Sequence, residues 1–383
     1  MDSIAELPLR KGKFNPNPEL SYTLPANYYF DPDVMRAEGE NIFMRSWLIA
    51  GFSHDLPEPG DYRTSMIANQ PVLIVRGKDS KIRAFYNVCR HRGHLLLKGC
   101  GHTGGIRCPF HSWAYDLTGR LIAAPNSECV PGFDKSDFHL AEIRVEEVAR
   151  MIFINFDEDA KPFEEVYPGL VQEFRDMVPG FDRVIWTRRD EYTIKANWKS
   201  VFDGLECYHC PYLHPGSMGG PNDRMQMSFE STDFEFFARH IIRGNPEVMD
   251  TAKGEAFGVG SDADLKDLNM WYVWPNILFM AHPGPANFKV AHVWPTGPET
   301  CVRYIDQFTL TNPPSEHDLA QMAKHKITFE EDLGAMESVQ IGLHAKGYSS
   351  GRLMVDRERS WKSEHATHHF QNLVWSALNT SKE

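Results

Sequence analysis

The sequence of 383 residues lacks any apolar run long enough to span a membrane, and its first residues contain no apolar core of a secretory signal. It has no internal repeat and no low-complexity tract, so nothing points to a repeat protein. It also lacks an excess of basic residues, because the net charge is -12, and this argues against a nucleic-acid-binding protein. We therefore expect a cytoplasmic globular protein that binds neither nucleic acid nor membranes.

Cysteine is scarce as well, with seven residues placed unevenly at positions 89, 100, 108, 129, 207, 210 and 301. An odd and scattered set in a chain of this length does not indicate a disulfide framework. Hydrophobic residues make up 42% and charged residues 24%, which allows a full core. We therefore expect a reducing compartment, in which some of the thiols bind metal.

Two patterns divide the chain, and together they predict the α+β class. Short strand-like segments separated by turn formers, such as PVLIVRG and MIFINFD, predict a small all-β domain over residues 45–160. Residues 1–44 contain the start of an amphipathic, helix-like stretch, PDVMRAEGENIFMRSW, and form a segment expected to pack on the second domain. Residues 161–383 combine aromatic-rich strands with a long helical pattern over residues 315–343.

The first group of candidate ligands is Cys89-x-His91, followed by Cys108-x-x-His111. Two Cys and two His could bind one tetrahedral zinc, although Cys-x-His is tight for a zinc-finger chelate. They could also bind a [2Fe–2S] cluster, with both thiolates on one iron and both imidazoles on the other, which is the Rieske arrangement. Two facing loops that each offer one Cys and one His suit the second geometry. A chance grouping without metal is the third interpretation.

Other residues in the same stretch are interpreted as parts of its loops. Five glycines (93, 99, 101, 104 and 105) suit tight turns whose backbone N–H groups approach the sulfides. Cys100, His94 and His102 complete no regular spacing, so they are expected to be loop residues. The basic residues could dock an acidic electron donor or form a solvated rim; they are Arg90, Arg92, Lys98 and Arg107.

The second group lies in NWKSVFDGLECYHCPYLHPG, residues 197–216. Glu206 and His209 are three apart, which places them on one face of a helix, and Pro211 permits a break that brings His214 back to them. Two His and a carboxylate form the facial triad of non-haem iron(II) oxygenases, with positions left open for dioxygen. The pair Cys207-x-x-Cys210 could be a redox or zinc pair, but small buried residues that pack the helix are favoured.

A carboxylate ligand is expected from the segment FEEDLGAMESVQIGL, and the helical pattern favours Asp332. On a helix, this residue leads a stripe that is apolar throughout, whereas Glu331 and Glu337 lead mixed faces; the stripe consists of Ala335, Met336, Val339 and Leu343. An acid that points into a core needs a compensating cation, such as a metal ion. The alternative interpretation is a helix-start residue near the N-terminal dipole.

These segments together resemble the oxygenase component of the Rieske non-haem iron oxygenases over nearly the whole length. CRHRG…CPFHSW is similar to the cluster motif of the family, NWKSVFDGLECYHCPYLHP to its iron-site motif, and EEDLGAMESVQIGL to the segment that donates the carboxylate. The endings ESVQIGLHAKGY and SEHATHHFQNL resemble the branch that oxidises carnitine, glycine betaine and related quaternary amines. The resemblance implies a Rieske domain followed by a helix-grip catalytic domain with an antiparallel sheet.

The resemblance also implies the metal ligands and their roles. The [2Fe–2S] cluster is expected on Cys89, His91, Cys108 and His111, and one iron(II) on His209, His214 and Asp332. Glu206 is expected to bridge a cluster in one subunit to the iron of its neighbour in a head-to-tail homotrimer. Ring-hydroxylating members usually have Asp at this position, so the longer Glu206 leaves the details of electron transfer open.

The implied reaction is a monooxygenation. A separate flavin/iron–sulfur reductase passes electrons from NAD(P)H to the cluster, they cross to the iron, and O2 is activated to hydroxylate a C–H bond. On a quaternary amine this gives N-demethylation or C–N cleavage. Aromatic faces hold such a cation best, and the chain offers Trp271, Tyr272, Trp274, Phe279 and Trp294, each of which is otherwise sheet core.

Two other functions stay open at this point. The first is a Rieske oxygenase that acts on an aromatic substrate, on its ring or by O- or N-demethylation. The second, from a different class, is a non-catalytic zinc-binding module, which would be colourless and would contain stoichiometric zinc.

Overall fold

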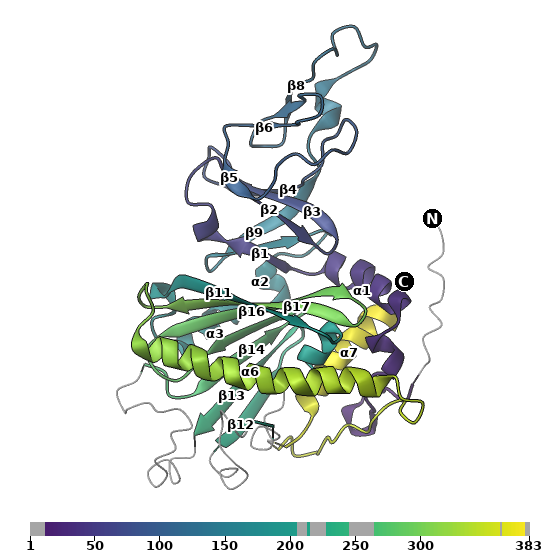
Figure 1. Ribbon diagram of the computed structural model, residues 1–383, viewed down its shortest axis with the longest axis vertical. Helices are drawn as coiled ribbons and strands as arrows, with labels where there is room; N and C mark the ends of the chain where they lie inside the picture. The colour runs from purple at the N-terminus through teal and green to yellow at the C-terminus, as the bar shows by residue number, and fades with distance from the viewer. Residues whose placement is uncertain (1–11, 205–212, 215–226, 245–263, 361, 380–383) are drawn as a thin grey trace. The chain divides into compact units, whose positions relative to one another are not determined.

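The computed structural model describes residues 12–204, 213–214, 227–244, 264–360 and 362–379 (Figure 1). It divides into two compact units. The smaller unit is Phe43–Val166, and the larger unit combines the residues up to Ile42 with those from Tyr167 onward. None of the helices among the described residues is long and apolar enough to cross a membrane.

The smaller unit is built almost entirely from antiparallel strands. Its seven-stranded sheet has the order β1-β10-β9-β4-β3-β2-β5, and a three-stranded sheet has the order β6-β7-β8. The strands are β1 Leu48–Phe52, β2 Asp61–Ile67, β3 Gln70–Arg76, β4 Ile82–Tyr86, β5 Cys100–His102, β6 Ile106–Arg107, β7 Ala114–Tyr115, β8 Leu121–Ala123, β9 Glu142–Val148 and β10 Met151–Asn155. The short helix α2, Phe163–Val166, ends the unit.

One hydrophobic core of the smaller unit joins its sheets to the loops that carry the first ligand group. Leu73, Phe85 and Tyr115 are fully buried in it, and Cys89 and Cys108 belong to the same cluster. Burial of these side chains removes apolar surface from water, and this stabilises the loops together with the sheets. The loops are therefore part of a packed core rather than flexible connections.

The larger unit is a seven-stranded antiparallel sheet with helices on both faces. The strand order is β11-β17-β16-β15-β14-β13-β12. The strands are β11 Ile185–Ile194, β12 Met227–Asp233, β13 Phe237–Gly244, β14 Leu268–Val273, β15 Ile277–Ala281, β16 Asn287–Gly297 and β17 Thr300–Thr309. The helices are α1 Pro32–Asn41, α3 Leu170–Met177, α6 Glu316–Leu343 and α7 His365–Asn379.

The two faces of this sheet have different covers. On one face Phe174 of α3 makes edge-on ring contacts with Trp271, Phe279 and Phe288, which gives a dry aromatic layer. The opposite face is crossed by the long helix α6 (Figure 1), where Phe329 contacts Tyr192. Since successive strand residues alternate between faces, one strand can supply aromatic residues to one face and polar residues to the other.

The α+β class is confirmed, and so is the long C-terminal helix. Helix α6 begins after Ser315, whose side chain accepts from the Asp318 N–H in a capping box, as expected for a Ser with an acid three residues later. The helix predicted from Pro32 to Trp47 is shorter, because α1 ends at Asn41 and a 3₁₀ turn, Phe43–Arg45, follows. The helix predicted to carry Glu206 and His209 lies outside the described residues, and the described start of its segment contains the 3₁₀ turn Trp198–Val201.

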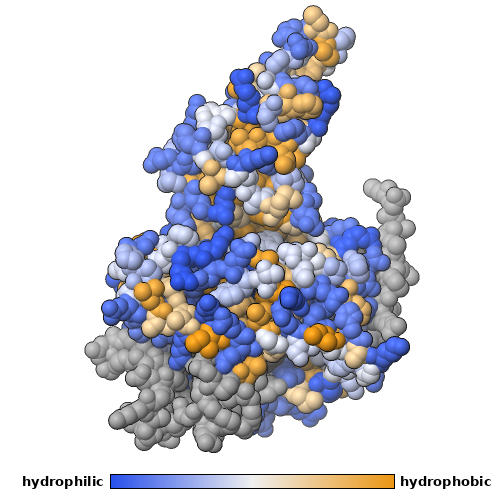
Figure 2. Space-filling view, viewed as in Figure 1, coloured by the Kyte–Doolittle hydropathy of each residue, from blue (hydrophilic) through white to orange (hydrophobic). Residues whose placement is uncertain are grey.

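Figure 2 shows that the face of the larger unit that carries α6 is mainly hydrophilic, with separate apolar patches. Among these exposed apolar side chains on α6 are Leu319, Ile327, Val339 and Ile341. Scattered apolar residues of this kind are normal on a protein surface.

Candidate metal centres

The first ligand group lies on two loops with the same backbone hydrogen-bond pattern. In the first loop, the Cys89 N–H donates to the His94 carbonyl at 2.8 Å and the Gly93 N–H to the Cys89 carbonyl at 3.0 Å. In the second loop, the Cys108 N–H donates to the Trp113 carbonyl at 2.8 Å and the Ser112 N–H to the Cys108 carbonyl at 3.1 Å. Each loop thus begins with a Cys and presents a His two or three residues later.

Both loops turn at the same point, through a residue with positive φ. Gly93 has φ 72° and Ser112 has φ 61°, each four residues after its Cys. Glycine adopts this conformation freely, whereas a serine does so at a cost that the surrounding packing must offset. A Cβ placed on Gly93 or Gly99 would meet no described atom within 4 Å, so the loops leave open space there.

The two thiols lie together at the buried end of this group. Cys89 and Cys108 are each only 2% exposed, and the pKa of Cys89 is raised by burial, with its hydrogen bond to Cys108 adding to the shift. The Tyr115 hydroxyl lies 3.4 Å from Cys89 Sγ and accepts from the Arg90 N–H at 3.1 Å, so its own hydrogen is directed to the sulfur. Two adjacent buried thiols become thiolates together only when a cation compensates their charge.

The two imidazoles lie together at the exposed end. The rings of His91 and His111 are 4.9 Å apart and edge-on, and the His91 ring stacks on Trp113 at 4.7 Å with an interplanar angle of 6°. His111 Nε2 lies 3.2 Å from the guanidinium of Arg92, which also covers the Phe110 ring at 5.5 Å. The remaining nitrogen, Nδ1 of His111, is the one free of this contact.

These observations fit a [2Fe–2S] cluster. The sulfur ligands form one pair and the nitrogen ligands another, one buried and one exposed, as required when each iron takes two protein ligands of one kind. The open space at the glycines and the raised thiol pKa both suit an inorganic core with positive iron. The four residues predicted from the sequence are therefore brought together.

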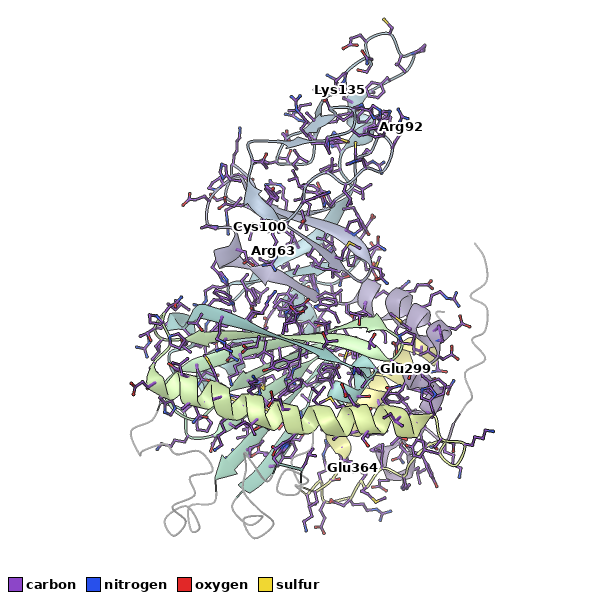
Figure 3. All side chains as sticks on the ribbon, viewed as in Figure 1. Arg63, Arg92, Cys100, Lys135, Glu299 and Glu364 are labelled. Carbon is purple, nitrogen blue, oxygen red and sulfur yellow. The ribbon has the colours of Figure 1, made fainter. Side chains whose placement is uncertain are left out.

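The neighbouring Cys and His have other surroundings. Cys100 is exposed on the short strand β5 and lies well apart from Arg92, which is at the imidazole end (Figure 3). His102 pairs with Asp61, its Nδ1 lying 2.9 Å from a carboxylate oxygen, and His94 Nδ1 lies at 2.5 Å from the Leu95 carbonyl. All four basic residues of the stretch are exposed; they are Arg90, Arg92, Lys98 and Arg107.

Two of the predicted iron ligands, His214 and Asp332, are described by the structure and lie beside each other in the larger unit. The side chain of His214 is 3% exposed, and its Nε2 is 3.3 Å from Oδ1 of Asp332. Two adjacent ligand atoms that each lie about 2.1 Å from one ion are separated by roughly 3.0–3.3 Å, so the pair fits a shared metal. A buried imidazole and a helix carboxylate from distant segments are thus brought to one point.

A second carboxylate contacts this histidine, and the sequence pattern did not predict that contact. Glu331 Oε2 lies 3.2 Å from His214 Nδ1, on the side of the ring opposite to Asp332. A carboxylate on one ring nitrogen fixes the tautomer and directs the other nitrogen to a metal. The mixed helix face of Glu331 does not predict this contact; the signal in the sequence is its position next to the predicted ligand Asp332.

The reasoning that selected Asp332 was wrong in one respect. Its stripe is not apolar and buried throughout, because Val339 is 54% exposed and the Asp332 side chain itself is 30% exposed. The carboxylate therefore lies at a partly open position rather than in a core, with Arg303 nearby. A partly open carboxylate beside a buried imidazole suits a metal that must admit a substrate.

Several predicted residues lie outside the described part of the chain. These are Glu206 and His209, together with Cys207 and Cys210. The segment that leads to them begins in a fully buried network: Lys199 Nζ lies 2.5 Å from Glu38 Oε1, and Trp198 Nε1–H donates to Glu38 Oε2 at 2.8 Å. This network ties the start of the iron-site segment to α1.

The aromatic candidates for a cation site fall in different places. Trp271 and Phe279 belong to the dry layer under α3, and Trp271 Nε1–H donates to Glu173 at 2.9 Å. Trp294 donates to His292 at 2.7 Å on this same face. Of the strand residues, only Tyr272 shares the face that α6 crosses. Trp274 lies in the turn between β14 and β15.

Comparison with known proteins identifies both domains. The sequence model of the Rieske [2Fe-2S] domain family matches residues 46–134. The sequence model of the ring hydroxylating alpha subunit (catalytic domain) family matches residues 181–380. The carnitine monooxygenase oxygenase subunit of Acinetobacter baumannii is 33% identical over 381 residues, covering 98% of this chain and 99% of that protein. The subunit of the same name from Escherichia coli K12 is 34% identical, covering 94% and 95% of the two chains.

A solved structure extends the likeness to three dimensions. The quaternary ammonium Rieske monooxygenase CntA in complex with L-carnitine superposes with a TM-score of 0.82 at 31% identity, covering 98% of this chain and all of that one. The fold and the two ligand groups thus define an oxygenase with a cluster domain and a catalytic iron domain. The chain belongs to the Rieske non-haem iron monooxygenases, as their oxygenase (alpha) subunit.

Membership of this family determines which cofactors the protein carries. The protein carries a Rieske [2Fe–2S] cluster and a mononuclear iron, and as an oxygenase subunit it works with a separate reductase and a small-molecule substrate. The zinc-module interpretation is therefore wrong.

Proposed function

We propose that this protein is the oxygenase subunit of a two-component monooxygenase that hydroxylates a quaternary ammonium compound of the carnitine or betaine type. The observation that carries the proposal is likeness over nearly the whole chain to carnitine monooxygenase subunits and to CntA with bound L-carnitine. Hydroxylation next to the quaternary nitrogen leads to N-demethylation or C–N cleavage.

We assign the ligands as the sequence predicted them. Cys89, Cys108, His91 and His111 hold the cluster, and His214 and Asp332 hold the iron with His209, which lies outside the described residues. When bound, the cluster supplies single electrons and the iron activates dioxygen, so that one oxygen atom enters a C–H bond and the other leaves as water. Glu331 orients His214, and the Tyr115 hydroxyl stabilises the charge on Cys89.

Electrons are proposed to cross between subunits. The exposed position of His91 and the partly exposed position of His111 support this route, because they leave the imidazole end accessible to a neighbour. Glu206 is the proposed bridge, a homotrimer the proposed assembly, and a flavin/iron–sulfur reductase the proposed donor. A cytoplasmic location, where NAD(P)H is available, stays a prediction.

Turnover with a reductase tests the proposal. The purified oxygenase with a carnitine-type reductase and NADH is offered L-carnitine, γ-butyrobetaine, glycine betaine and choline, with naphthalene as the aromatic probe. We expect consumption of at least one quaternary amine, with trimethylamine or formaldehyde as product. Oxidation of the aromatic probe alone would replace the quaternary amines by the arene alternative.

A further inference from the structure

The face of the catalytic sheet that α6 crosses carries buried cations. Lys289 lies directly opposite Gln307, and Arg303 directly opposite Val293, in the paired strands β16 and β17. Directly opposed residues and every second residue along a strand share a face, so Lys289 and Arg303 point to the same side. Arg303 stacks on Phe329 of α6, with its guanidinium carbon 4.4 Å from the ring centre, which places this side under the helix.

Neither cation is fully satisfied. Lys289 is 3% exposed and Arg303 is 5% exposed. Within the described residues, Lys289 Nζ and Arg303 Nε have no hydrogen-bond partner. A buried ammonium without a partner is costly, so a cation in this position indicates that an anion binds there in the working protein.

The acids near Lys289 are engaged elsewhere. Asp190 accepts from Arg188 at 3.1 Å and from the Gln307 amide at 3.1 Å. Asp318 accepts from the Ser315 N–H and hydroxyl in the capping box of α6. Asp332, which acts on Arg303 through its charge, is committed to the metal site. The positive charge of Lys289 therefore has no dedicated counter-ion among the residues described.

The histidines of this region add to the same imbalance. His282 and His325 lie with their rings 5.1 Å apart, and burial followed by the charge of Lys289 holds the pKa of both well below the usual range. Burial lowers the pKa of Lys289 itself to about 7, opposed by Asp190 and reinforced by Arg303. The basic groups disfavour one another's charge, which an added anion would reverse.

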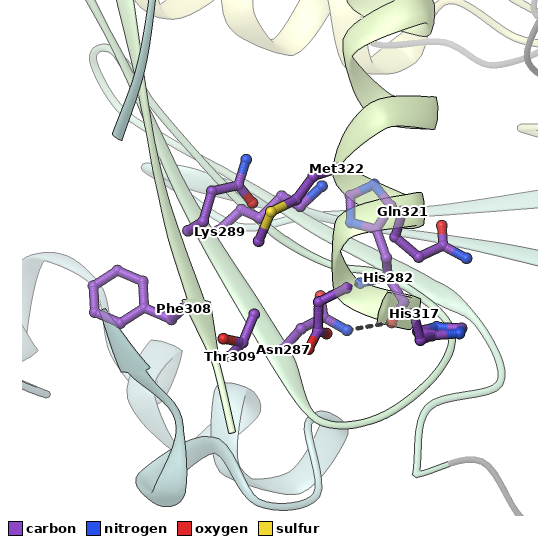
Figure 4. Close-up of a pocket in the computed structure, with 10 residues that line it drawn as sticks. His282, Asn287, Lys289, Phe308, Thr309, His317, Gln321 and Met322 are labelled. Atoms are coloured by element: carbon purple, nitrogen blue, oxygen red, sulfur yellow. Dashed lines mark hydrogen bonds between the residues drawn. The ribbon is translucent and has the colours of Figure 1, made fainter. Parts of the chain in front are cut away.

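A small cavity opens beside Lys289 (Figure 4). It has room for about one water-sized oxygen atom, and its walls include His282, Gln307, Met322 and the Asp318 carboxylate. Helix α6 runs from this cavity to Asp332, ten residues beyond Met322 and so about 15 Å along the axis. The cations therefore lie on the side of the sheet that holds the iron ligand, between that ligand and the start of α6.

We propose that Lys289 binds the carboxylate of a zwitterionic quaternary ammonium substrate. This deepens the proposed function and rests on it. An ammonium in a desolvated site binds a carboxylate through charge-assisted hydrogen bonds, while the trimethylammonium end extends toward the metal. The site thereby selects substrates with a carboxylate over cations such as choline, because a ligand that has no anion leaves Lys289 unpaired.

Two ligands that differ only in the anion test the proposal. γ-Butyrobetaine and the matching alcohol, 4-hydroxybutyl-trimethylammonium, are titrated calorimetrically into the iron-loaded wild type, Lys289→Met and Lys326→Met. Lys326 is the control, because it lies on the same helix as Phe329 with its side chain 59% exposed. We expect Lys289→Met to weaken the binding of γ-butyrobetaine by about 10- to 100-fold and the binding of the alcohol by less than about 2-fold. The affinities of Lys326→Met for both ligands should equal those of the wild type.

Equal weakening of both ligands by Lys289→Met, or equal affinity of the wild type for both, would overturn the proposal. If Lys289→Met does not fold, Lys289→Gln replaces it, and the comparison of the two ligands in the wild type needs no variant. A wild type that binds neither ligand and oxidises no quaternary amine would instead contradict the proposed function, so the two failures are distinguishable.

Discussion

The proposed cluster ligands come from two copies of one loop within residues 89–111, whereas His214 and Asp332 of the proposed iron site lie over a hundred positions apart. In the smaller unit, the backbone itself places each Cys and His, and the sheet core holds the loops. In the larger unit, the packing of α6 on the sheet brings the carboxylates to the histidine. The first centre depends on local structure and the second on tertiary packing. We therefore expect that a substitution can abolish one centre while the other one stays intact.

The largest effect is expected at Asp332. Asp332→Ala removes the carboxylate 3.3 Å from His214, so the mononuclear iron should be lost and coupled turnover should fall at least about 1,000-fold. The red-brown colour and the reduced EPR signal of the cluster should persist. Iron analysis and EPR measure both, with Glu330→Gln on the same helix as the control. Loss of the cluster in Asp332→Ala would contradict the independence of the two centres.

The converse substitution is Cys108→Ala in the smaller unit. One buried thiolate of the pair is lost, so the cluster should not assemble, and reductase-coupled turnover should fall by a similar factor. Inorganic sulfide and visible absorption check this result. Cys100→Ser, at an exposed thiol on β5, should keep the cluster in full. A colourless Cys100→Ser protein would show that the ligand set is wrong.

A smaller effect is expected at Glu331. Glu331→Gln keeps the size of the side chain but removes the charge that orients His214, so iron affinity or activity should fall about 10- to 100-fold. Competition with an iron chelator measures the affinity. Glu337→Gln, which loses the charge of an acceptor for the Lys195 N–H, is the matched control. Equal effects of the two variants would mean that Glu331 acts through the helix and not through His214.

Tyr115→Phe tunes the cluster without removing it. The hydroxyl donates to the Cys89 sulfur and stabilises the more negative, reduced cluster, so its loss should lower the reduction potential. A shift of about 60 mV corresponds to about 1.4 kcal/mol for one electron, which is the scale of a hydrogen bond to a charged group. Redox titration followed by EPR measures it. An unchanged potential would show that the hydrogen bond is not formed to the ligating sulfur.

The smallest effect concerns acid stability, where the two units should again differ. His240 of β13 is fully buried, and burial lowers its pKa to about 4, whereas the unfolded chain has the ordinary value of 6.5. Between these values the unfolded state binds more protons, so the larger unit loses stability as pH falls below about 6.5. The histidines of the smaller unit are exposed or partly exposed.

Thermal unfolding between pH 7.5 and 5 checks this difference. The loss of helical signal should move to lower temperature with falling pH before cluster absorption is lost. His240→Gln should flatten the pH dependence of the first transition by about one proton. An unchanged slope in the variant would assign the acid sensitivity to other groups.

The comparison also explains what the sequence could predict. Cys89, His91, Cys108 and His111 could be proposed from the sequence because a loop motif keeps its candidate ligands close in the sequence and their expected roles follow from residue type. Asp332 stays a predicted ligand, and the argument for it is partly wrong, since helix periodicity does not tell which face of α6 meets the sheet. Glu331 was missed for the same reason, because its role depends on the position of His214.

Lys289 could not be recognised from its surroundings in the sequence. NFKVAHVW reads as a buried strand with one lysine, and a lysine in such a pattern is usually at an exposed edge. Only the register with β17 shows that it faces Gln307 under α6. The aromatic candidates for a cation site could not be sorted from the sequence for the same reason. Alternation within a strand does not tell which face is the core under α3 and which one faces the iron site.

The central claim is that two separate iron centres are held by these ligands, and iron and sulfide analysis with low-temperature EPR of the reduced protein tests it most directly. The account predicts about three iron atoms and two sulfides per chain, a Rieske signal in the wild type, and its selective loss in Cys108→Ala but not in Asp332→Ala. A colourless wild type with stoichiometric zinc, or the loss of both centres in either variant, would contradict it.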